Sequence, residues 1–406
     1  MKLLDNRLFR RLLLSCTFAL GAFLIVASGG SGSGSSDGSC RLVVSAIAPV
    51  AGSDDIWVGV LSELPTGEFN SVVRLRRDGS EALPPIPLDR GSENVVRTVA
   101  MAEFFNDVYV GGDFSEGIFR LDEDGLLDNT FDVGSGFDGP VSTIVPAVDG
   151  SGDIYVGGFF TTYKGFPVGG LVRLTDDGSL SANFTTSAIQ AVAMSSLTDP
   201  GSVYSGGYLF PGLLRWSSTA IIDSSFEVKP LNFAPVFSIE LVAGGFGAVY
   251  AGGGFSNGIS RINNDGSPDS SFAVGNGFND IVRKIVHTAD FTGDIYAVGE
   301  FTTYQGTTAN GLVRLKKNGS PETGFFTGTG FSNSDGLVPF GEFASSALAA
   351  NASSDIYVAG DFTDYDGTTA DGIVRLNSDG SLDPDFKARV SSETGTCTDG
   401  NFVKDD

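Results

Sequence analysis

Residues 153–160 read Asp-Ile-Tyr-Val-Gly-Gly-Phe-Phe, and the pattern (Ile/Val)-Tyr-Val-Gly-Gly-x-Phe returns along the chain of 406 residues. Its aromatic position is occupied by Trp57, Tyr109, Tyr155, Tyr204, Tyr250, Tyr296 and Tyr357. The mean spacing of about 50 residues is the length of one β-propeller blade. Short β-rich runs alternate with Gly turns, and no long segment has a helical period. The sequence therefore predicts an all-β fold, a seven-bladed β-propeller of four-stranded antiparallel blades in a closed ring.

An arginine follows each copy of this motif, usually between two apolar residues, as in Val172-Arg173-Leu174. In six of the seven units an Asp or Asn lies four residues after this arginine, and a Gly lies five residues after it. Such loops are typical of a three-residue hairpin, in which Gly adopts the required positive φ. Each unit then has four strands, which in the third unit are expected at roughly 141–148, 153–160, 170–175 and 180–185.

This hairpin predicts a carboxylate partner for the recurring arginine. Blades of a propeller are covered on both faces, so a guanidinium in the middle of a strand loses water and needs a negative charge nearby. An acid lies eight residues after the arginine in five units, which makes a structural role more reasonable than a catalytic one. The expected pairs are Arg120–Asp128, Arg215–Asp223, Arg261–Asp269, Arg314–Glu322 and Arg375–Asp383.

The repeated text resembles the delta-60 repeat family, a bacterial β-propeller repeat of unknown function. The resemblance rests on Asp379-Gly380-Ser381-Leu382-Asp383 with Phe386, and on residues 153–160 followed by Tyr163, Gly165 and residues 170–174. It covers about residues 95–390 and is weaker in unit one, where Gly59-Val60-Leu61 replaces Gly-Gly-x-Phe, and in unit four, where the Asp-Gly turn is missing. The family implies a bacterial envelope or extracellular location and no established catalytic residues.

The first residues have the order of a secretory signal peptide. Lys2, Arg7, Arg10 and Arg11 precede an apolar run from Leu12 to Ala27, and small residues follow. We therefore expect a signal peptide over residues 1–28, with an uncleaved N-terminal anchor or lipidation at Cys16 as alternatives. Residues 29–39 form a Gly/Ser linker, residues 40–397 the propeller, and residues 398–406 an acidic tail. The expected location is secreted, periplasmic or cell surface, and membrane contact would involve only an uncleaved N-terminal segment.

Cleavage of the leader leaves two cysteines, one at each end of the repeated region. In an oxidising compartment Cys40 and Cys397 are expected to form a disulfide that joins the first blade to the last. Two free structural thiols are the alternative.

The charge balance limits the partners. The chain carries 49 Asp and Glu against 25 Lys and Arg, a net charge of −24. Because binding to phosphate groups needs a basic surface, we expect no nucleic-acid partner. The expected partner is an extracellular protein or a glycan.

Units three, six and seven share two aromatic loops. A Gly-x-Gly-Phe loop precedes each of them, and a long loop with a Tyr joins their second and third strands. Both loops are expected on one rim, opposite the Asp-Gly turns. The functional interpretation is a ligand-binding face, and the alternative is that the rings only fill their own loops. The six residues concerned are Phe137, Tyr163, Phe278, Tyr304, Phe331 and Tyr365.

Calcium is a weaker possibility among the acidic residues. Asp113, Glu300 and Asp361 stand at the variable position of Gly-Gly-x-Phe, and residues 122–128 contain a fragment resembling a calcium loop. Neither has the full set of oxygen ligands, and a solvated acidic rim or turn-forming Asp residues explain them as well. No cofactor is therefore expected, with Ca²⁺ as the open alternative.

Catalysis has little support in the residue inventory. His287 is the sole histidine, so a His metal cluster is ruled out, and this residue fits a buried or channel-lining position. The function that we expect is a secreted or cell-envelope, non-enzymatic binding or scaffold module. The alternatives are an extracellular carbohydrate-active enzyme with paired carboxylates in the central funnel and a Ca²⁺-dependent adhesion module.

Overall fold

The computed structural model describes residues 40–404, apart from residues 51, 65–66, 89–94, 104–105, 185, 187–188, 195–201, 209–211, 227, 229–234, 245–246, 291, 334–345, 351–354, 393–394 and 399–400. Within these ranges the chain forms strands, turns and bends, and no helix there has the length and hydrophobicity to cross a bilayer. The expected leader (1–28) and linker (29–39) lie outside the described residues.

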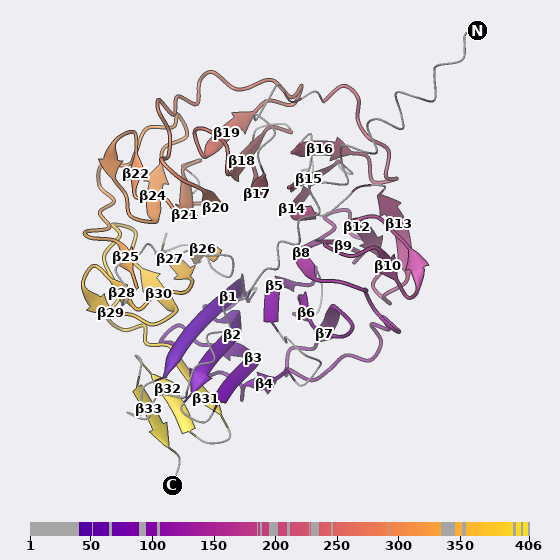
Figure 1. Cartoon of the computed structure of the whole chain (residues 1–406), viewed down its shortest axis with the longest axis horizontal. Coiled ribbons are helices and arrows are strands. Elements are labelled where there is room, and N and C mark those ends of the chain that lie inside the picture. The colour runs from indigo at the N-terminus through magenta and orange to yellow at the C-terminus, as the bar shows by residue number, and fades with distance from the viewer. Residues whose placement is uncertain are drawn as a thin grey trace, which may run out of the picture.

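Antiparallel sheets, one for each sequence repeat, follow one another around a common centre (Figure 1). Repeat one forms β1 (Arg41–Pro49), β2 (Ile56–Leu64), β3 (Gly67–Leu75) and β4 (Ile86–Pro87). Repeat two forms β5 (Val95–Met101), β6 (Val108–Asp113) and β7 (Ile118–Leu121). Repeat three forms β8 (Val141–Pro146), β9 (Ile154–Gly158), β12 (Leu171–Leu174) and β13 (Leu180–Phe184).

The remaining repeats have the same order of strands. Repeat four forms β14 (Ile189–Met194), β15 (Val203–Gly207) and β16 (Leu213–Trp216). Repeat five forms β17 (Val236–Leu241), β18 (Val249–Gly253) and β19 (Ile259–Ile262). Repeat six forms β20 (Val282–His287), β21 (Ile295–Gly299) and β24 (Leu312–Leu315), and repeat seven forms β26 (Ser346–Ala350), β27 (Asp355–Ala359) and β30 (Ile373–Leu376). An all-β fold with propeller-like antiparallel repeats is thus confirmed.

The fourth strand is shorter than predicted in most repeats. Repeats one and three hold four-stranded sheets. In the other repeats the fourth segment, where it is described, pairs with the third strand at one residue only, as Leu127 does with Leu121. The acid that follows bends the chain out of the ladder, because Asp128 Oδ1 accepts the N–H of Thr130 at 2.9 Å. In repeat five the bridging residue is Pro268, which has no N–H to donate.

Repeats three, six and seven add small strands on the outer side of their sheets (Figure 1). In repeat three β10 (Thr162–Tyr163) pairs with β11 (Phe166–Pro167). In repeat six β22 (Thr303–Tyr304) pairs with β23 (Thr307–Thr308). In repeat seven β28 (Asp364–Tyr365) pairs with both β29 (Thr368–Thr369) and β25 (Phe331–Ser332). These are the three repeats with a long loop between the second and third strands.

The core lies between neighbouring sheets. The first strand of each repeat is nearest the centre in Figure 1 and contacts the first strand of the next repeat, in the order β1, β5, β8, β14, β17, β20 and β26. Strand β26 in turn contacts β1. One apolar cluster combines Val58 and Leu75 of repeat one with Tyr357 and Phe386 of repeat seven. Apolar burial therefore joins the first repeat to the last.

One backbone hydrogen bond recurs where the end of a repeat meets an Asp-Gly turn of a following repeat. The donors and acceptors are Asp132 N–H to Asp177 carbonyl (3.1 Å), Ala273 to Asn318 (2.9 Å), Phe326 to Asp379 (2.8 Å) and Lys387 to Asp78 (2.9 Å). The last of these runs from the end of repeat seven to the turn of repeat one. The junction between the two ends of the repeated region thus uses the same contact as the internal junctions.

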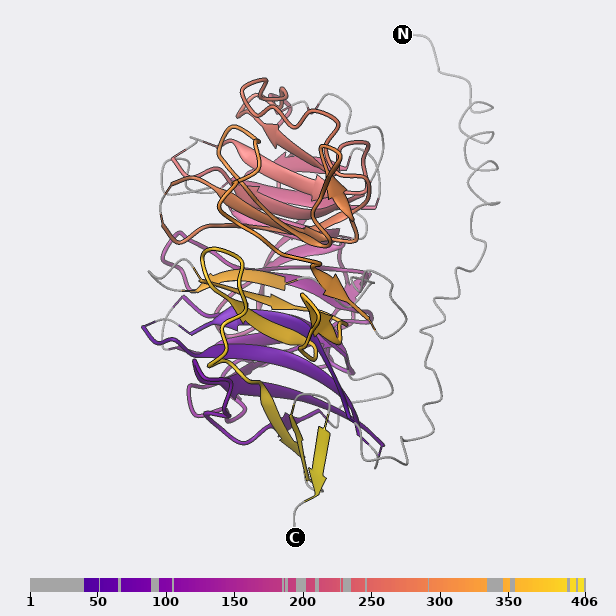
Figure 2. The same cartoon turned by 90° about the vertical axis from the view of Figure 1, so that its left-hand side faces the viewer.

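A separate sheet follows the last repeat. Strands β31 (Arg389–Ser392), β32 (Gly395–Thr398) and β33 (Asn401–Lys404) form an antiparallel meander beside repeat one in both views (Figures 1 and 2). The expectation of an acidic tail from residue 398 is therefore wrong. The reason is local, because β32 and β33 pair directly with each other, with Thr398 opposite Asn401. Cys397 in β32 forms a disulfide with Cys40, with Cα atoms 6.0 Å apart.

Candidate functional site

The motif aromatic and the recurring arginine face each other across the second and third strands of each repeat. The cross-strand pairs are Trp57–Arg74, Tyr109–Arg120, Tyr155–Arg173, Tyr204–Arg215, Tyr250–Arg261, Tyr296–Arg314 and Tyr357–Arg375. In six repeats a Phe packs against the motif Tyr, with ring centroids 5.1 to 5.8 Å apart. These rows of rings and guanidinium groups are buried or nearly so, and they therefore belong to the scaffold.

In repeats two, four and five the arginine joins two elements. Arg120 Nε donates to Asp128 Oδ2 at 2.7 Å, and its Nη1 donates to the carbonyl of Asp176 in the turn of repeat three at 3.0 Å. Arg215 and Arg261 repeat this arrangement with Asp223 and Asp269 and with the carbonyls of Asn264 and Lys317. The guanidinium thus links its own hairpin to the next sheet.

Repeat six departs from the expected pairing. Arg314 forms ion pairs with Asp290 at 2.6 Å and Asp294 at 3.0 Å, while Glu322 pairs with Lys316 at 3.3 Å. The expected pair Arg314–Glu322 is therefore wrong. Asp294 immediately precedes β21, whose Tyr296 lies opposite Arg314 in the ladder, so its carboxylate is within closer reach. In repeat seven Arg375 contacts both kinds of partner, Asp355 at the start of β27 and Asp383 at 3.0 Å.

The six aromatic residues expected on a binding face are buried. Each is at most 4% exposed: Phe137, Tyr163, Phe278, Tyr304, Phe331 and Tyr365. The structure does bring them together in pairs, since in each of the three repeats the Phe and the Tyr have ring centroids 4.6 to 4.7 Å apart. Burial raises the pKa of Tyr304 to about 12. The rings fill their own loops, and the expected exposed face is wrong.

The tyrosine hydroxyls show how these loops fold. Tyr163 donates its O–H to the carbonyl of Gly178 at 2.6 Å, and Tyr304 donates to Gly319 at 2.5 Å. Tyr365 makes the same bond to Gly380. Each acceptor is the Gly of the Asp-Gly turn in the same repeat. The hairpins therefore fold back along the outer side of the sheet toward these turns, instead of standing on the opposite rim.

The acids at the variable position of Gly-Gly-x-Phe are paired with arginines. Asp113 forms an ion pair with Arg97 at 2.6 Å, and Glu300 and Asp361 pair with Arg283 and Arg41. In the calcium-like fragment, Asp122 Oδ1 accepts the N–H groups of Asp124 at 3.0 Å and Leu126 at 2.8 Å, as in a capped turn. Among the described residues no group of three or more His, Cys, Asp or Glu is arranged to hold a metal ion.

A row of two exposed rings and one half-buried ring crosses repeats three to five at the Gly-Gly end of the sheets. We call Phe159, Tyr208 and Phe237 the aromatic arc. Phe159 follows β9 and is 40% exposed, and Tyr208 follows β15 and is 42% exposed. Their ring centroids are 6.0 Å apart, and Tyr208 lies 5.4 Å from Phe237 of β17. The three rings thus form a continuous row over three successive sheets.

An ion pair continues the arc into repeat six. The guanidinium carbon of Arg283 lies 4.5 Å from the ring centroid of Phe237, and Arg283 Nε donates to Glu300 Oε1 at 2.7 Å. Phe237 and Arg283 stand at the β-bulges of β17 and β20, where the extra residue turns its side chain away from the regular ladder. The row of rings therefore ends at the Arg283–Glu300 ion pair, whose guanidinium and carboxylate carry hydrogen-bond donors and acceptors.

Sequence reasoning missed the arc for a physical reason. Phe159 and Tyr208 both follow the Gly-Gly pair of the motif, so the sequence could have indicated two aromatic side chains at equivalent positions of neighbouring repeats. Gly254 leaves this position without a side chain in repeat five, and Phe237 takes its place in the row from another strand. That substitution depends on the bulge in β17, which the alternation of apolar residues does not reveal.

His287 lies on β20 beside the neighbouring inner strand. Its ring is half-buried, Nε2 is 3.9 Å from Glu240 Oε1, and the ring centroid is 6.0 Å from that of Tyr250. Partial burial raises the pKa of Glu240. This pair is separate from the contacts that build the aromatic arc.

Four segments of the chain match the family model described as "Domain of unknown function (DUF5122) beta-propeller". They are residues 150–184, 239–272, 292–325 and 354–386, which fall in repeats three, five, six and seven. Each segment ends on the recurring Phe that packs against the motif Tyr. The match supports β-propeller repeats in these four segments. No curated protein matches the chain in sequence.

Solved structures with a similar fold have low sequence identity to the chain. The crystal structure of Chaetomium thermophilum Raptor has a TM-score of 0.54 and 12% identity over 85% of this chain and 29% of that chain. The structure of selenomethionine-substituted virginiamycin B lyase from Staphylococcus aureus has a TM-score of 0.49 and 16% identity over 70% of this chain and 87% of that chain. Likeness at such identities concerns the fold alone.

Proposed function

We propose that this protein is a secreted or cell-envelope β-propeller with seven blades in a closed ring, which binds neutral glycans through the aromatic arc and catalyses no reaction. The observation that carries the proposal is the row Phe159–Tyr208–Phe237, because contiguous aromatic rings, two of them exposed, on a rigid scaffold are unusual at a surface without a binding role. The ring arrangement is supported by the contacts of β26 with β1 and by the Lys387–Asp78 hydrogen bond.

The chemistry of the arc favours a neutral ligand with both apolar and polar faces. Ring faces offer large contact area for the C–H side of a sugar, and the Arg283–Glu300 pair offers donors and acceptors for hydroxyl groups. The net charge of −24 opposes polyanionic ligands through the field of the whole molecule. A neutral glycan satisfies both conditions.

The non-enzymatic part of the proposal rests on the carboxylates near the arc. Glu300 is held by Arg283, and the matching acids Asp361 and Asp113 are held by Arg41 and Arg97. An arginine partner favours the ionised carboxylate and opposes its use as a proton donor. The extracellular part rests on the signal-like residues 1–28 and on the disulfide, which is typical of oxidising compartments.

A glycan array with the purified chain tests the proposal. We expect binding to neutral oligosaccharides, represented by cello-, manno- and chito-oligomers, and no binding to heparin or hyaluronan. Tyr208→Ala and Phe159→Ala should each weaken the binding at least tenfold, because each removes a stacking face. Phe166→Ala is the matched control, since Phe166 is 69% exposed on β11 and lies outside the arc.

Two results would contradict the proposal. Equal loss of binding in the Phe166 variant would show that surface apolarity in general, and not the arc, is responsible. Preference for the anionic polymers would reject the charge argument. Melting temperatures of the three variants verify that each one is folded.

A further inference from the structure

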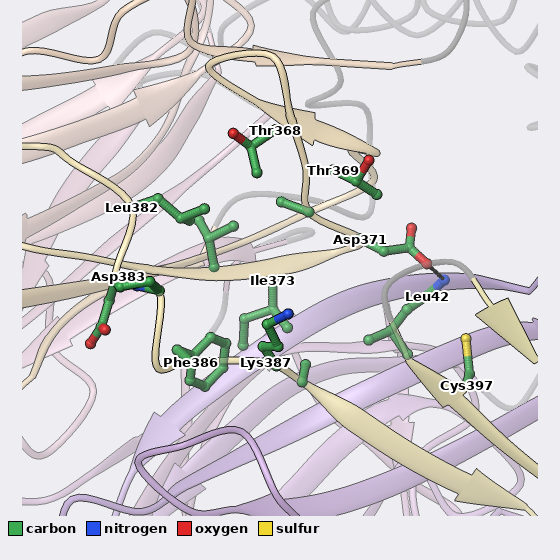
Figure 3. Close-up of a pocket in the computed structure, with 14 residues that line it drawn as sticks. Leu42, Thr368, Thr369, Asp371, Ile373, Leu382, Asp383, Phe386, Lys387 and Cys397 are labelled. Atoms are coloured by element: carbon green, nitrogen blue, oxygen red, sulfur yellow. Dashed lines mark hydrogen bonds between the residues drawn. The ribbon is translucent and has the colours of Figure 1, made fainter.

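A cavity of about 300 Å³ lies where repeat seven meets repeat one, and the fold itself uses the groups around it (Figure 3). Leu42 is buried here beside Gly372. Phe137 takes the same place beside Gly117, where repeat two meets repeat three. The Oδ2 atom of Asp371 accepts the N–H of Leu42 at 2.8 Å. The cavity therefore belongs to the packing of this junction.

The Arg283–Glu300 pair at the end of the aromatic arc keeps polar atoms that no other protein group uses. Arg283 donates to one carboxylate oxygen twice, from Nε to Glu300 Oε1 at 2.7 Å and from Nη2 to the same atom. Within the described part of the chain, Glu300 Oε2 and Arg283 Nη1 make no hydrogen bond, and both atoms are accessible to solvent. The pair therefore presents an acceptor and a donor to a ligand.

The scaffold holds this pair in place. The guanidinium carbon of Arg283 lies 4.5 Å from the ring centroid of Phe237, and stacking on a ring restricts how the guanidinium can turn. Arg283 stands at the bulge of β20, and Glu300 follows β21 directly, so both come from the ends of paired strands. Donor and acceptor are therefore preorganised, which lowers the entropic cost of binding.

The equivalent ion pair in repeat two is closed. Arg97 and Asp113 hold the same positions, at the bulge of β5 and at the end of β6. Arg97 donates from Nε to Asp113 Oδ1 at 2.8 Å and from Nη2 to Oδ2 at 2.6 Å, so both carboxylate oxygens accept a bond. The Asp113 side chain is 8% exposed, against 27% for Glu300. Of these two pairs, the one in repeat six is thus open to a ligand.

Sugar chemistry indicates which group fits this pair. In a 1,4-linked hexose chain C1 and C4 carry the linkages, so the adjacent hydroxyl groups left on an inner residue are those at C2 and C3. One of them can donate to Glu300 Oε2 while the other accepts from Arg283 Nη1, and hydrogen bonds to charged groups are the stronger ones. An acetamido group at C2 removes one of the two hydroxyls.

We propose that the Arg283–Glu300 pair selects, among neutral glycans, 1,4-linked hexose chains with free hydroxyl groups at C2 and C3, and discriminates against 2-acetamido sugars. This inference rests on the proposed function, because the aromatic arc must hold a glycan before the pair can select one. The rings of the arc supply contact area that does not depend on these hydroxyls, and the ion pair supplies the specificity.

Isothermal titration calorimetry with cellotriose and chitotriose on the full chain at neutral pH tests this inference, because the two trisaccharides share their linkage and differ at C2. We expect cellotriose to bind at least tenfold more tightly. Glu300→Gln replaces an oxygen acceptor with an N–H donor. It should weaken the binding of cellotriose at least tenfold and leave that of chitotriose unchanged, because a hydrogen bond to a charged group is lost for the first sugar alone.

Asp361→Asn is the matched control, because Asp361 holds the position of Glu300 in repeat seven, pairs with Arg41 and lies outside the arc. It should change neither affinity. Arg283→Lys is a second test, which keeps the positive charge, removes the Nη donors and should also reduce the preference for cellotriose. Melting temperatures verify that each variant is folded.

The outcomes separate this inference from the proposed function. Equal affinity for the two trisaccharides, weakened in both cases by Tyr208→Ala, overturns the inference and leaves glycan binding by the arc in place. A preference for cellotriose that persists in both Glu300→Gln and Arg283→Lys has the same meaning. Absence of binding by both trisaccharides overturns the inference together with the proposed function.

Discussion

At the scale of the residue, every buried cation among the described residues is a recurring arginine. Arg375 is 2% exposed and contacts two carboxylates, Asp355 and Asp383. A buried pair adds little net stability compared with apolar packing, but removal of one partner leaves an uncompensated charge in the interior. The arginines therefore stabilise the fold by compensating the charge of the buried carboxylates beside them.

Arg375→Met is expected to lower the free energy of unfolding by about 3–5 kcal/mol, because it leaves two buried carboxylates without a cation. Arg76→Met is the control, since Arg76 is exposed and bonds only to Ser80 and nearby carbonyls. Urea denaturation followed by circular dichroism measures both. Similar losses in the two variants would contradict the structural role of the recurring arginine.

Acid should destabilise the protein through the hairpin carboxylates. Hydrogen bonds from Ser225 and the guanidinium of Arg215 hold the pKa of Asp223 at about 2, below its ordinary value of 3.8. A depressed folded-state pKa contributes stability above the ordinary value, and this contribution disappears as the pH falls through the folded-state value.

Ser225→Ala tests this expectation, because it removes the hydrogen bond from the Ser225 hydroxyl to the Asp223 carboxylate. We expect its melting temperature to lie below that of the unaltered chain at pH 7 and the difference to shrink between about pH 4 and pH 2. Differential scanning calorimetry over this range is the measurement. A difference that does not change with pH would show that Ser225 stabilises the fold in another way.

Much of the residue-scale pattern could be predicted, and the exceptions have physical reasons. The pairing of four recurring arginines with the acid eight residues further on follows from the hairpin, because identical spacing gives identical register, as in Arg120–Asp128 and Arg215–Asp223. The partner of Arg314 could not be read from spacing, because carboxylates on two strands compete for one guanidinium. Exposure of Tyr163 and Tyr304 also depends on where their hairpins fold, which is a tertiary property.

At the scale of the element, the Asp-Gly turns make close contacts between repeats. Gly380 has φ 88°, and an added Cβ would lie 2.4 Å from the carbonyl oxygen of Phe326 in the preceding junction. Gly367 of the β28–β29 hairpin has φ 72°, but an added Cβ would meet no atom within 4 Å. The first glycine is therefore needed for both conformation and space, and the second for conformation alone.

Gly367→Ala is expected to destabilise the protein by about 1–2 kcal/mol through its left-handed conformation. Gly380→Ala should destabilise it clearly more, because the added atom also forces the backbone of two repeats apart. Chemical denaturation of the two variants measures the difference. Equal losses would contradict the close packing of the turn against Phe326.

The strands and turns were easier to predict than the small outer hairpins. Ala220 replaces the turn Gly in repeat four and still adopts φ 63°, so the turn persists where its sequence signal is missing. The hairpins fold back because the Tyr hydroxyls find acceptors in the Asp-Gly turns, and only the assembled repeat brings these groups together. The aromatic arc was missed for the same reason, since one of its rings comes from a bulge.

At the scale of the whole molecule, the first and last repeats are joined in two ways. One is the apolar cluster and the Lys387–Asp78 hydrogen bond between the repeats themselves. The other is the disulfide, which closes a loop with a sequence separation of 357 residues and in the chain-entropy estimate stabilises the fold by at most about 5–6 kcal/mol. Because Cys397 lies on the C-terminal sheet, the disulfide reinforces the junction from outside the repeats.

The central claim is that the repeats form one closed ring, in which repeat seven packs against repeat one. Small-angle X-ray scattering on a variant with both Cys40→Ser and Cys397→Ser tests this claim most directly. Non-covalent closure predicts the same radius of gyration as for the oxidised chain. An increase in the radius of gyration of the folded variant would contradict the claim, because it would show that the disulfide alone holds the two ends together.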